Sequence, residues 1–272
     1  MNGEEKTFSI TFAKKIREIS VKMVHEANAS HIGGALSMAD ILAVLYNDIL
    51  HYQPQGPNWK ERDRLLLSKG HACVSLYAAL ALKGFFPEEH LTTYGQNGTD
   101  LLCHISHHVP GVEVSAGSLG HGLPFGVGMA LAAQRRHEAY DTFVIVGDGE
   151  MDEGSNWEAL MFAGHHHLSN LCTVIDYNKI QSLGSIDEVM TLEPLADKLR
   201  AFNCRVIRVN GHDHRALLDA FREFRAEKSR PTVIIADTVK GKGVSYMENN
   251  LAWHYKSPND EQLKTALEEI EQ

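Results

Sequence analysis

Residues 143–180, FVIVGDGEMDEGSNWEALMFAGHHHLSNLCTVIDYNKI, contain two apolar runs that each end in a polar side chain. The first run leads into Asp148 between two glycines, and the second leads to Asn178. Apolar runs of this length predict buried strands, and the helical pattern between them predicts that the strands are parallel. Ligands of open parallel sheets bind beyond the carboxyl ends of the strands, so both polar side chains are predicted to lie at a ligand-binding edge.

The same alternation of strand and helix patterns extends along the chain. Further strands are predicted at 65–67, 205–209 and 232–237, and helices at 70–82, from Pro124 to about Tyr140, and at 156–164, 195–202 and 216–227. Helical patterns at 11–25 and 37–50 form an N-terminal preamble. An acidic helical tail is predicted at 259–272. This order predicts an α/β fold, with a mostly parallel central sheet covered by helices on both faces. No repeat or long linker is visible, so one domain over 1–272 is expected.

Composition excludes several classes of function. The chain has 272 residues, 43% of them hydrophobic, which is enough for a substantial core. Its net charge of -9 argues against a nucleic-acid surface. The 4 cysteines form no C-x-x-C pair, which favours a reduced, cytoplasmic setting over a zinc or redox site. The start, MNGEEKTFSI, lacks the apolar region of a signal peptide, and no run is apolar enough for a membrane span.

Asp148 and Asn178 together suggest a cation site. Gly147 and Gly149 allow a tight turn and a close approach of a ligand to the backbone. If the two strands are neighbours, a carboxylate and an amide oxygen converge on one hard cation, and Mg²⁺ combines such oxygens with phosphate oxygens. The residues therefore indicate a metal-held diphosphate, although Asp-Gly and Tyr-Asn-Lys are also ordinary turn sequences.

A set of motifs in a fixed order carries a family resemblance. Asp148-Gly149 followed by Asn178 resembles the thiamine-diphosphate-binding motif of thiamine-dependent enzymes. The surrounding text resembles transketolase in particular, through SHIGGALSMADILAVLY, RDRLLLSKGHA, PGVEVSAGSLGHG, GDGEMDEGSNWEALMFAGHH, YNKIQ, VNGHD, PTVIIADTVKGKG and MENNLAWH. These motifs cover nearly the whole chain, so the resemblance implies the diphosphate-binding (PP) domain of that family.

The resemblance assigns cofactor and metal ligands to individual residues. It implies that Asp148, Asn178 and the Ile180 carbonyl bind Mg²⁺, with Ca²⁺ or Mn²⁺ as alternatives. The residues that it implies for thiamine diphosphate are His71, Gly117, Leu119, Asp148, Gly149, Asn178, Ile180 and His254. Without the family pattern, His71 is equally typical of a structural histidine at a helix start, and the GSLGHGLPFG loop alone is a weak signal.

Three histidines are expected to act in catalysis. The resemblance places His31, His104 and His254 along the substrate channel, where a neutral imidazole can accept and return a hydroxyl proton near neutral pH. The chain has 16 histidines, so most are structural or exposed. The run 165–167 is assigned to that class, and the HISHH spacing at 104–108 is a weaker prediction of a metal site than His104 is of a channel residue.

The resemblance also implies the reaction and a partner. Transketolases pass a two-carbon ketol unit from a ketose phosphate to an aldose phosphate. The family's activating glutamate belongs to a separate pyrimidine-binding domain, which the sequence after residue 258 cannot supply. The chain is therefore expected to be the N-terminal subunit of a split transketolase, inactive alone and assembled as α₂β₂ with a pyrimidine-domain subunit, without nucleic acid or membrane.

Four positions depart from the family pattern: Ile32, His121, Ala252 and Tyr255. QSLG also replaces the usual acidic Asp-Gly after the asparagine loop. Tyr255 adds bulk beside His254, where glycine is typical, which suggests a donor or acceptor other than the ordinary pentose phosphates.

Three alternatives remain open at this point. The chain could be a subunit of another thiamine-dependent enzyme, such as a split oxo-acid dehydrogenase, or a catalytically lapsed cofactor-binding subunit. GHGLPFG and the α/β alternation also allow a dinucleotide-dependent oxidoreductase, although that fingerprint should open a helix directly after a strand. The sugars, the pathway and the stoichiometry do not follow from the sequence.

Overall fold

Five parallel strands form the central sheet of the computed structural model, which describes residues 3–272, with side chains from residue 8 onward; residues 1 and 2 of the predicted domain lie outside it. The strands are β1 (Arg64–Leu67), β2 (Thr142–Gly147), β3 (Leu171–Tyr177), β4 (Arg205–Asn210) and β5 (Thr232–Asp237). Their order in the sheet is β1-β2-β3-β5-β4, and every pair is parallel. The predicted α/β class and strand positions are confirmed.

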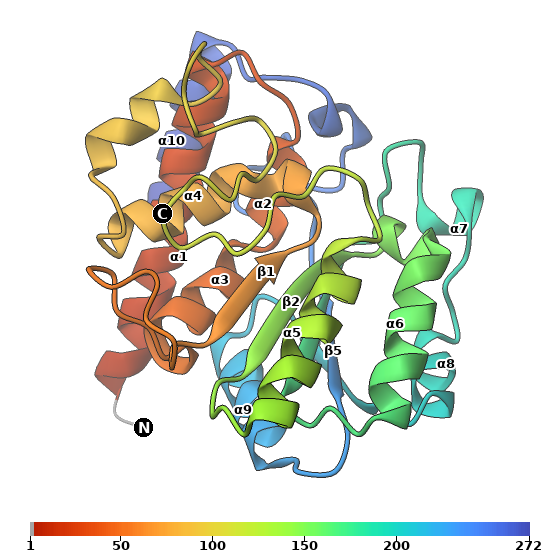
Figure 1. The fold of residues 1–272 in the computed structure, drawn as a ribbon. Coiled ribbons are helices and arrows are strands. Elements are labelled where there is room, and N and C mark those ends of the chain that lie inside the picture. The colour runs from red at the N-terminus through yellow and green to blue at the C-terminus, as the bar shows by residue number, and fades with distance from the viewer. Residues whose placement is uncertain (1–2) are drawn as a thin grey trace.

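Helices cover both faces of the sheet, as Figure 1 shows. Phe143 of β2 packs in one core cluster with Phe221 and Phe224 of α9 (His214–Ala226), and it meets both rings edge-on. Val144, the next residue, packs in the other cluster with α5 (Gly122–Arg136) and α6 (Gly154–His165). Burial on both faces explains why the central strands read as unbroken apolar runs.

The N-terminal preamble is helical but interrupted. It consists of α1 (Gly3–Glu26), α2 (Ile32–Ser37), α3 (Ala39–Val44) and a π-helical turn, Leu45–Ile49. The C-terminal tail is α10 (Asp260–Glu271), which begins with a capping box between Asn259 and Gln262. Its buried residues Ala266 and Ile270 belong to the core cluster that includes α1. The tail is therefore an integral part of the fold.

Other helix boundaries differ from the sequence-based prediction. The helix expected to run from Pro124 to Tyr140 covers Gly122–Arg136, because His137 adopts a left-handed backbone with φ 57° and ends it. The segment before it is a long loop, so GHGLPFG does not follow a strand as a dinucleotide fingerprint requires. The remaining helices are α4 (Cys73–Leu82), α7 (Ile186–Val189) and α8 (Leu195–Ala201), with short 3-10 turns at 70–72, 88–93, 149–152 and 251–254.

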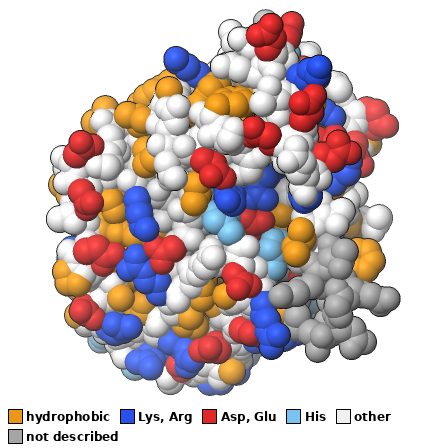
Figure 2. All heavy atoms as spheres, turned by 180° about the vertical axis from the view of Figure 1, so that it is seen from behind, with side chains coloured by type: hydrophobic (Ala, Val, Ile, Leu, Met, Phe, Trp, Pro, Cys, Tyr) orange, Lys and Arg blue, Asp and Glu red, His pale blue; other side chains and the backbone are white. Residues whose placement is uncertain are grey.

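Two surface features bear on partners. Among the described residues, no helix is long and apolar enough to cross a membrane. Figure 2 shows acidic and basic side chains interspersed over one face, so that face presents no continuous basic surface of the kind that binds nucleic acid.

Candidate functional site

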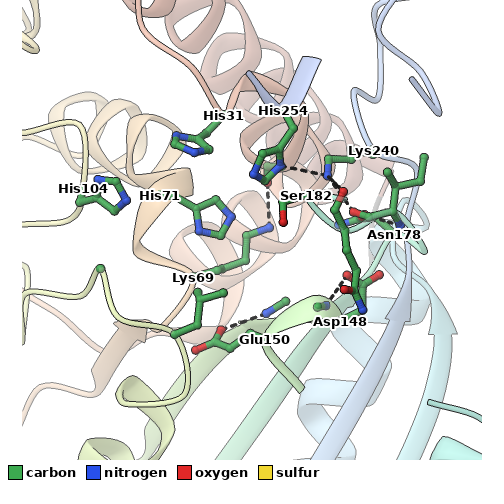
Figure 3. A pocket seen from close by; sticks show the side chains of 17 residues that line it. His31, Lys69, His71, His104, Asp148, Glu150, Asn178, Ser182, Lys240 and His254 are labelled. Carbon is green, nitrogen blue, oxygen red and sulfur yellow. Dashed lines mark hydrogen bonds between the residues drawn. The ribbon is translucent and has the colours of Figure 1, made fainter. Parts of the chain in front are cut away.

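A cavity of about 250 Å³ opens where the segments after β1, β2, β3 and β5 meet. Residues at the start of α2, in the loop before α5 and in the 3-10 turn 251–254 complete its wall (Figure 3). Its lining contains His31, His71, His104, Gly117, Leu119, Asp148, Gly149, Asn178, Ile180 and His254. The fold thus gathers the complete predicted set at one place, while the role of each residue stays a prediction.

Asp148 begins the turn after β2 and is 3% exposed. Its Oδ1 accepts a hydrogen bond from the Gly149 N–H at 2.7 Å, and its Oδ2 accepts one from the Lys179 N–H. Burial, followed by the negative charge of Asp176, raises the pKa of Asp148 to about 6, although both amide donors favour the ionised form. Asp148 is therefore a desolvated carboxylate whose hydrogen bonds come from backbone amides.

Asn178 follows the neighbouring strand, because β2 and β3 pair directly. Its Nδ2 donates to Asp176 Oδ2 at 3.3 Å, and its Oδ1 accepts from the Ile180 N–H at 3.2 Å. Since the carboxylate of Asp176 can take only the NH₂ side of the amide, it fixes which way the amide is turned. Asn178 is 6% exposed, so this orientation is held within the protein.

Asp176 lies beneath the cavity and is fully buried. Its carboxylate also accepts hydrogen bonds from the Lys69 ammonium and from the hydroxyls of Ser37 and Thr238. Burial alone would raise the pKa of Asp176, but the Lys69 charge and these hydrogen bonds lower it. An ionised Asp176 thus ties the segments after β1, β3 and β5 together below the cavity.

The Ile180 carbonyl faces Lys240, which the sequence analysis did not predict as a site residue. Lys240 Nζ donates to this carbonyl at 2.7 Å and to His254 Nδ1 at 3.2 Å. Burial, together with the nearby Lys69 ammonium, lowers the pKa of Lys240 to about 8, while the charge of Asp148 acts in the opposite direction. A carbonyl has two lone pairs, so Ile180 can accept from Lys240 and still contribute to a cation.

The arrangement fits a divalent cation and an anionic group. Asp148, Asn178 and Ile180 supply a carboxylate, an amide oxygen and a carbonyl, the oxygen ligands that hard cations prefer. Gly149 lines the cavity with its backbone alone, because it has no side chain. A Cβ built there would lie 3.0 Å from Gln181 Cγ and would narrow the cavity. The donor set and the glycine therefore both suit a metal-bound phosphate group.

Four histidines form one cluster on the other side of the cavity. The His31 ring lies 5.2 Å from that of His71, 5.7 Å from His104 and 5.0 Å from His254, measured between centroids. Burial is the main cause that lowers the pKa of His31 to about 4, of His254 to about 3, and of His71 well below its usual range; nearby positive charges add to it. These three rings are neutral near pH 7.

Other histidines lie outside the cavity lining. His165 ends α6 and is exposed, as expected for the run 165–167. His107 pairs with the Ser115 hydroxyl at 2.8 Å. No group of three or more His, Cys, Asp or Glu side chains that could hold a metal exists in the described part of the chain, so the weaker HISHH metal prediction gains no support.

The sequence-based prediction missed four polar residues around the cavity: Lys69, Glu150, Asp176 and Lys240. Glu150 is 2% exposed and accepts hydrogen bonds from the Ser68 hydroxyl and from the Gly120 N–H, at 2.9 Å for the latter. All four stand inside the motifs SKGHA, GDGE, IDYN and TVKGKG. A charged residue beside a predicted site residue in a buried run is the signal that could have found them.

Comparison with known proteins gives a consistent result. The sequence model of the family described as "Transketolase, thiamine diphosphate binding domain" matches residues 9–270. The chain is 43% identical over 260 residues to the 6-deoxy-6-sulfo-D-fructose transketolase subunit SqwG of Clostridium sp., covering 95% of this chain and 94% of that protein. It is 42% identical over 258 residues to an apulose-4-phosphate transketolase subunit of Phocaeicola vulgatus, covering 95% and 92%.

Solved structures agree with the sequence relatives. The transketolase from Leishmania mexicana superposes with a TM-score of 0.91 at 32% identity, covering 97% of this chain and 41% of that one. The transketolase from Campylobacter jejuni gives a TM-score of 0.91 at 30% identity, covering 100% and 43%. The chain therefore spans about two fifths of the length of these solved transketolases, but nearly the full length of the subunit relatives.

Proposed function

This chain belongs to the transketolase family through its thiamine-diphosphate-binding domain, and we propose that it is the N-terminal subunit of a two-chain transketolase, folded as a single PP domain. In this proposal it transfers a two-carbon ketol unit from a ketose donor to an aldose acceptor. The observation that carries the proposal is the meeting of Asp148, Asn178, the Ile180 carbonyl and the four-histidine cluster in one cavity.

The metal ligands in this proposal rest on the donor set, and the residues around thiamine diphosphate rest on the family resemblance. Asp148, Asn178 and the Ile180 carbonyl would hold Mg²⁺, or Ca²⁺ or Mn²⁺ in its place, and His71 and Gly149 would contact the diphosphate. Gly117 and Leu119 also line the cavity, and by the family resemblance they would contact the aminopyrimidine ring. Bound thiamine diphosphate supplies the electron sink for breaking the carbon–carbon bond beside a ketose carbonyl.

The protein's own residues handle protons and orientation. His254 Nδ1 accepts a hydrogen bond from the Lys240 ammonium, so the proton of this neutral ring resides on Nε2. From Nε2 His254 can donate to a sugar oxygen. His31 and His104 line the same cavity, and the lowered pKa of His31 keeps its ring neutral at neutral pH. His31 Nδ1 lies 3.0 Å from the Ser30 hydroxyl, and when Nδ1 donates this hydrogen bond, Nε2 carries the lone pair that can accept a hydroxyl proton.

The partner in this proposal is a separate chain that carries the pyrimidine-binding domain. The names of the two relatives covered over nearly their full length call each a transketolase subunit, which supports a two-chain assembly. We extend this to an α₂β₂ heterotetramer. The four cysteines of the chain are free thiols, which agrees with a reducing cytoplasm.

The substrate in this proposal is a ketose other than the ordinary pentose phosphates. The relatives are named for 6-deoxy-6-sulfo-D-fructose and for apulose 4-phosphate, so one name includes a sulfo group and the other a phosphate. The bulky Tyr255 beside His254 adds a second reason to expect a modified sugar. An anionic terminus on the ketose is therefore the shared chemistry that we expect.

Ketol transfer with defined mixtures tests the function. The purified chain and a pyrimidine-domain chain are assayed separately and together, with Mg²⁺ and thiamine diphosphate. The donors are xylulose 5-phosphate, apulose 4-phosphate and 6-deoxy-6-sulfo-D-fructose. Activity in the mixture alone supports the proposal. Full activity of the isolated chain contradicts the two-chain arrangement, and a stable complex that is inactive with every donor favours a lapsed subunit.

A further inference from the structure

A buried group of charged and histidine side chains lies outside the cavity lining, where α1, α3 and α9 meet. The Asp40 carboxylate accepts hydrogen bonds from Arg17 Nη1 at 3.1 Å and Nη2 at 2.5 Å, from His212 Nδ1 at 2.7 Å and from His214 Nε2 at 3.0 Å. Asp40 is 5% exposed. Burial would raise the pKa of Asp40, but Arg17 and both imidazoles hold it well below its usual range. Asp40 is thus a fixed negative charge.

The hydrogen bonds of His212 determine its protonation. The Val239 N–H donates to His212 Nε2 at 2.8 Å. A backbone N–H can only donate, so Nε2 carries a lone pair and the ring proton is on Nδ1, from which it is donated to Asp40. His212 is therefore a neutral imidazole held at both ends, by a carboxylate on one side and by a backbone amide on the other.

The amide that His212 holds belongs to the residue directly before Lys240. On the other side of Lys240, the Lys242 carbonyl accepts a hydrogen bond from Arg17 Nε at 3.0 Å. Arg17 and His212 both also bind Asp40. The backbone that carries Lys240 is therefore attached to the Asp40 group before and after this lysine.

From this backbone the Lys240 side chain reaches into the cavity. Its stem passes over Gly33, where an added Cβ would lie 3.1 Å from Lys240 Cγ. Its ammonium ends 2.7 Å from the Ile180 carbonyl and 3.2 Å from His254 Nδ1. Figure 3 shows Lys240 and His254 joined by this hydrogen bond in the cavity. A path this narrow leaves little freedom to correct a displaced backbone.

We propose that Asp40 and His212 are positioning residues for Lys240, and that they act through the hydrogen bond from the Val239 N–H to His212 Nε2. Asp40 fixes the tautomer and orientation of His212, His212 fixes the Val239 amide, and the amide sets where the Lys240 ammonium meets Ile180 and His254. The consequence for the reaction rests on the proposed function, whereas the position of Lys240 can be measured without it.

Two substitutions of His212 separate its hydrogen bond with the Val239 N–H from its hydrogen bond with Asp40. His212→Gln places a side-chain oxygen near the position of Nε2 and keeps an acceptor for the Val239 N–H. His212→Asn places an NH₂ group near the position of Nδ1 and keeps a donor for Asp40, but leaves the Val239 N–H without its acceptor. If His212 serves only to donate a hydrogen bond to Asp40, His212→Asn should disturb Lys240 less than His212→Gln. If His212 positions Lys240, His212→Gln should disturb it less.

The rate of reductive methylation of Lys240, followed by mass spectrometry, reports how firmly its amine is held. Lys69 is the internal reference, because it binds Asp176 and the Gly34 carbonyl, which neither variant touches. We expect His212→Asn to raise the ratio of the Lys240 rate to the Lys69 rate about tenfold and His212→Gln to leave it within about twofold, in keeping with the loss of one buried hydrogen bond. Equal ratios in both variants, or a larger rise in His212→Gln, overturn the proposal.

A second measurement separates this proposal from the proposed function. The wild type, His212→Asn and His212→Gln, each in complex with the pyrimidine-domain chain, are titrated with thiamine diphosphate in the presence of Mg²⁺. Weaker binding by His212→Asn alone supports both. The wild-type complex binding no thiamine diphosphate would contradict the proposed function. The positioning role would still stand if the ratio of the Lys240 to the Lys69 methylation rate rose in His212→Asn and not in His212→Gln. If His212→Asn binds thiamine diphosphate as tightly as the wild type although its Lys240 is methylated faster, the positioning of Lys240 has no role in cofactor binding.

Discussion

The Lys69 ammonium donates a hydrogen bond to the Asp176 carboxylate, and the two side chains are 2% and 0% exposed. Removing one member of a buried ion pair leaves the other charge without its partner, which costs about 3–5 kcal/mol. Lys69→Met should therefore lower the free energy of unfolding by about 3 kcal/mol in urea denaturation. The double variant Lys69→Met/Asp176→Asn should recover part of this loss, since it removes both charges.

The exposed pair of Arg200 and Asp197 provides a matched control. Its side chains are 58% and 71% exposed, so Arg200→Met should change the free energy of unfolding by less than about 1 kcal/mol. Equal effects of Lys69→Met and Arg200→Met would show that the buried pair does not stabilise the sheet edge.

Asp148 should determine metal affinity. Asp148→Asn removes the one carboxylate of the predicted ligand set, and we expect Mg²⁺ affinity in the presence of thiamine diphosphate to fall about 100-fold. Calorimetric Mg²⁺ titration measures this change. Asp197→Asn, the same chemical change on exposed α8, should leave the affinity unaltered. Mg²⁺ binding as tight in Asp148→Asn as in the wild type would remove Asp148 from the metal site.

Asp141 should make stability depend on pH. Burial, followed by the charge of Asp63, raises the pKa of Asp141 to about 6, above an unfolded value of about 3.9. The native protein thus binds this proton more tightly than the unfolded chain. The resulting stabilisation is complete below about pH 4 and is lost as pH rises through about 6. The Asp141 side chain is 25% exposed, so we expect a cost of about 1–2 kcal/mol above pH 6.

Denaturation of Asp141→Asn as a function of pH tests this dependence. The variant should be more stable than the wild type at pH 7–8 and equally stable near pH 4. Asp63→Asn is the contrasting change, because Asp63 accepts hydrogen bonds from the His51 N–H, the Asp141 N–H and Arg225. It should destabilise the protein at neutral pH. A constant difference between Asp141→Asn and wild type from pH 4 to 8 would contradict the shift.

The strands and their polar ends could be predicted from the sequence because the signals are local. Unbroken apolar runs revealed β2 and β3, and polar residues directly after them located Asp148 and Asn178. The family resemblance then selected His31 and His254 among 16 histidines, a choice that composition alone could not make. In the structure, all four of these residues line one cavity.

The residues that escaped prediction owe their places to long-range contacts. Lys69 and Asp176 are paired across 107 positions, and His212 and Asp40 across 172. A charged residue inside an apolar run can be noticed in the sequence, but the sequence does not show which distant residue it pairs with. The end of α5 was misplaced for a different reason, since His137 stops the helix through a left-handed backbone that residues other than glycine seldom adopt.

Tyr255 should influence which sugar the proposed enzyme accepts. Its hydroxyl donates to the Ser182 carbonyl at 3.1 Å, and its ring lies 4.8 Å from that of His254, between centroids. Ser182 and His254 both line the cavity, so Tyr255 joins two parts of its wall. The side chain is 59% exposed, and Tyr255→Phe should therefore change the free energy of unfolding by less than about 1 kcal/mol.

Two variants of Tyr255 separate bulk from hydrogen bonding. Tyr255→Gly removes the ring and should raise kcat/KM for xylulose 5-phosphate, relative to that for the best wild-type donor, by about tenfold, the scale of one altered pocket contact. Tyr255→Phe keeps the ring and should leave this ratio within about threefold. Steady-state kinetics of the complex with the pyrimidine-domain chain measure both. A shift as large in Tyr255→Phe as in Tyr255→Gly would assign the effect to the Ser182 contact, and no shift in either would leave donor choice to residues other than Tyr255.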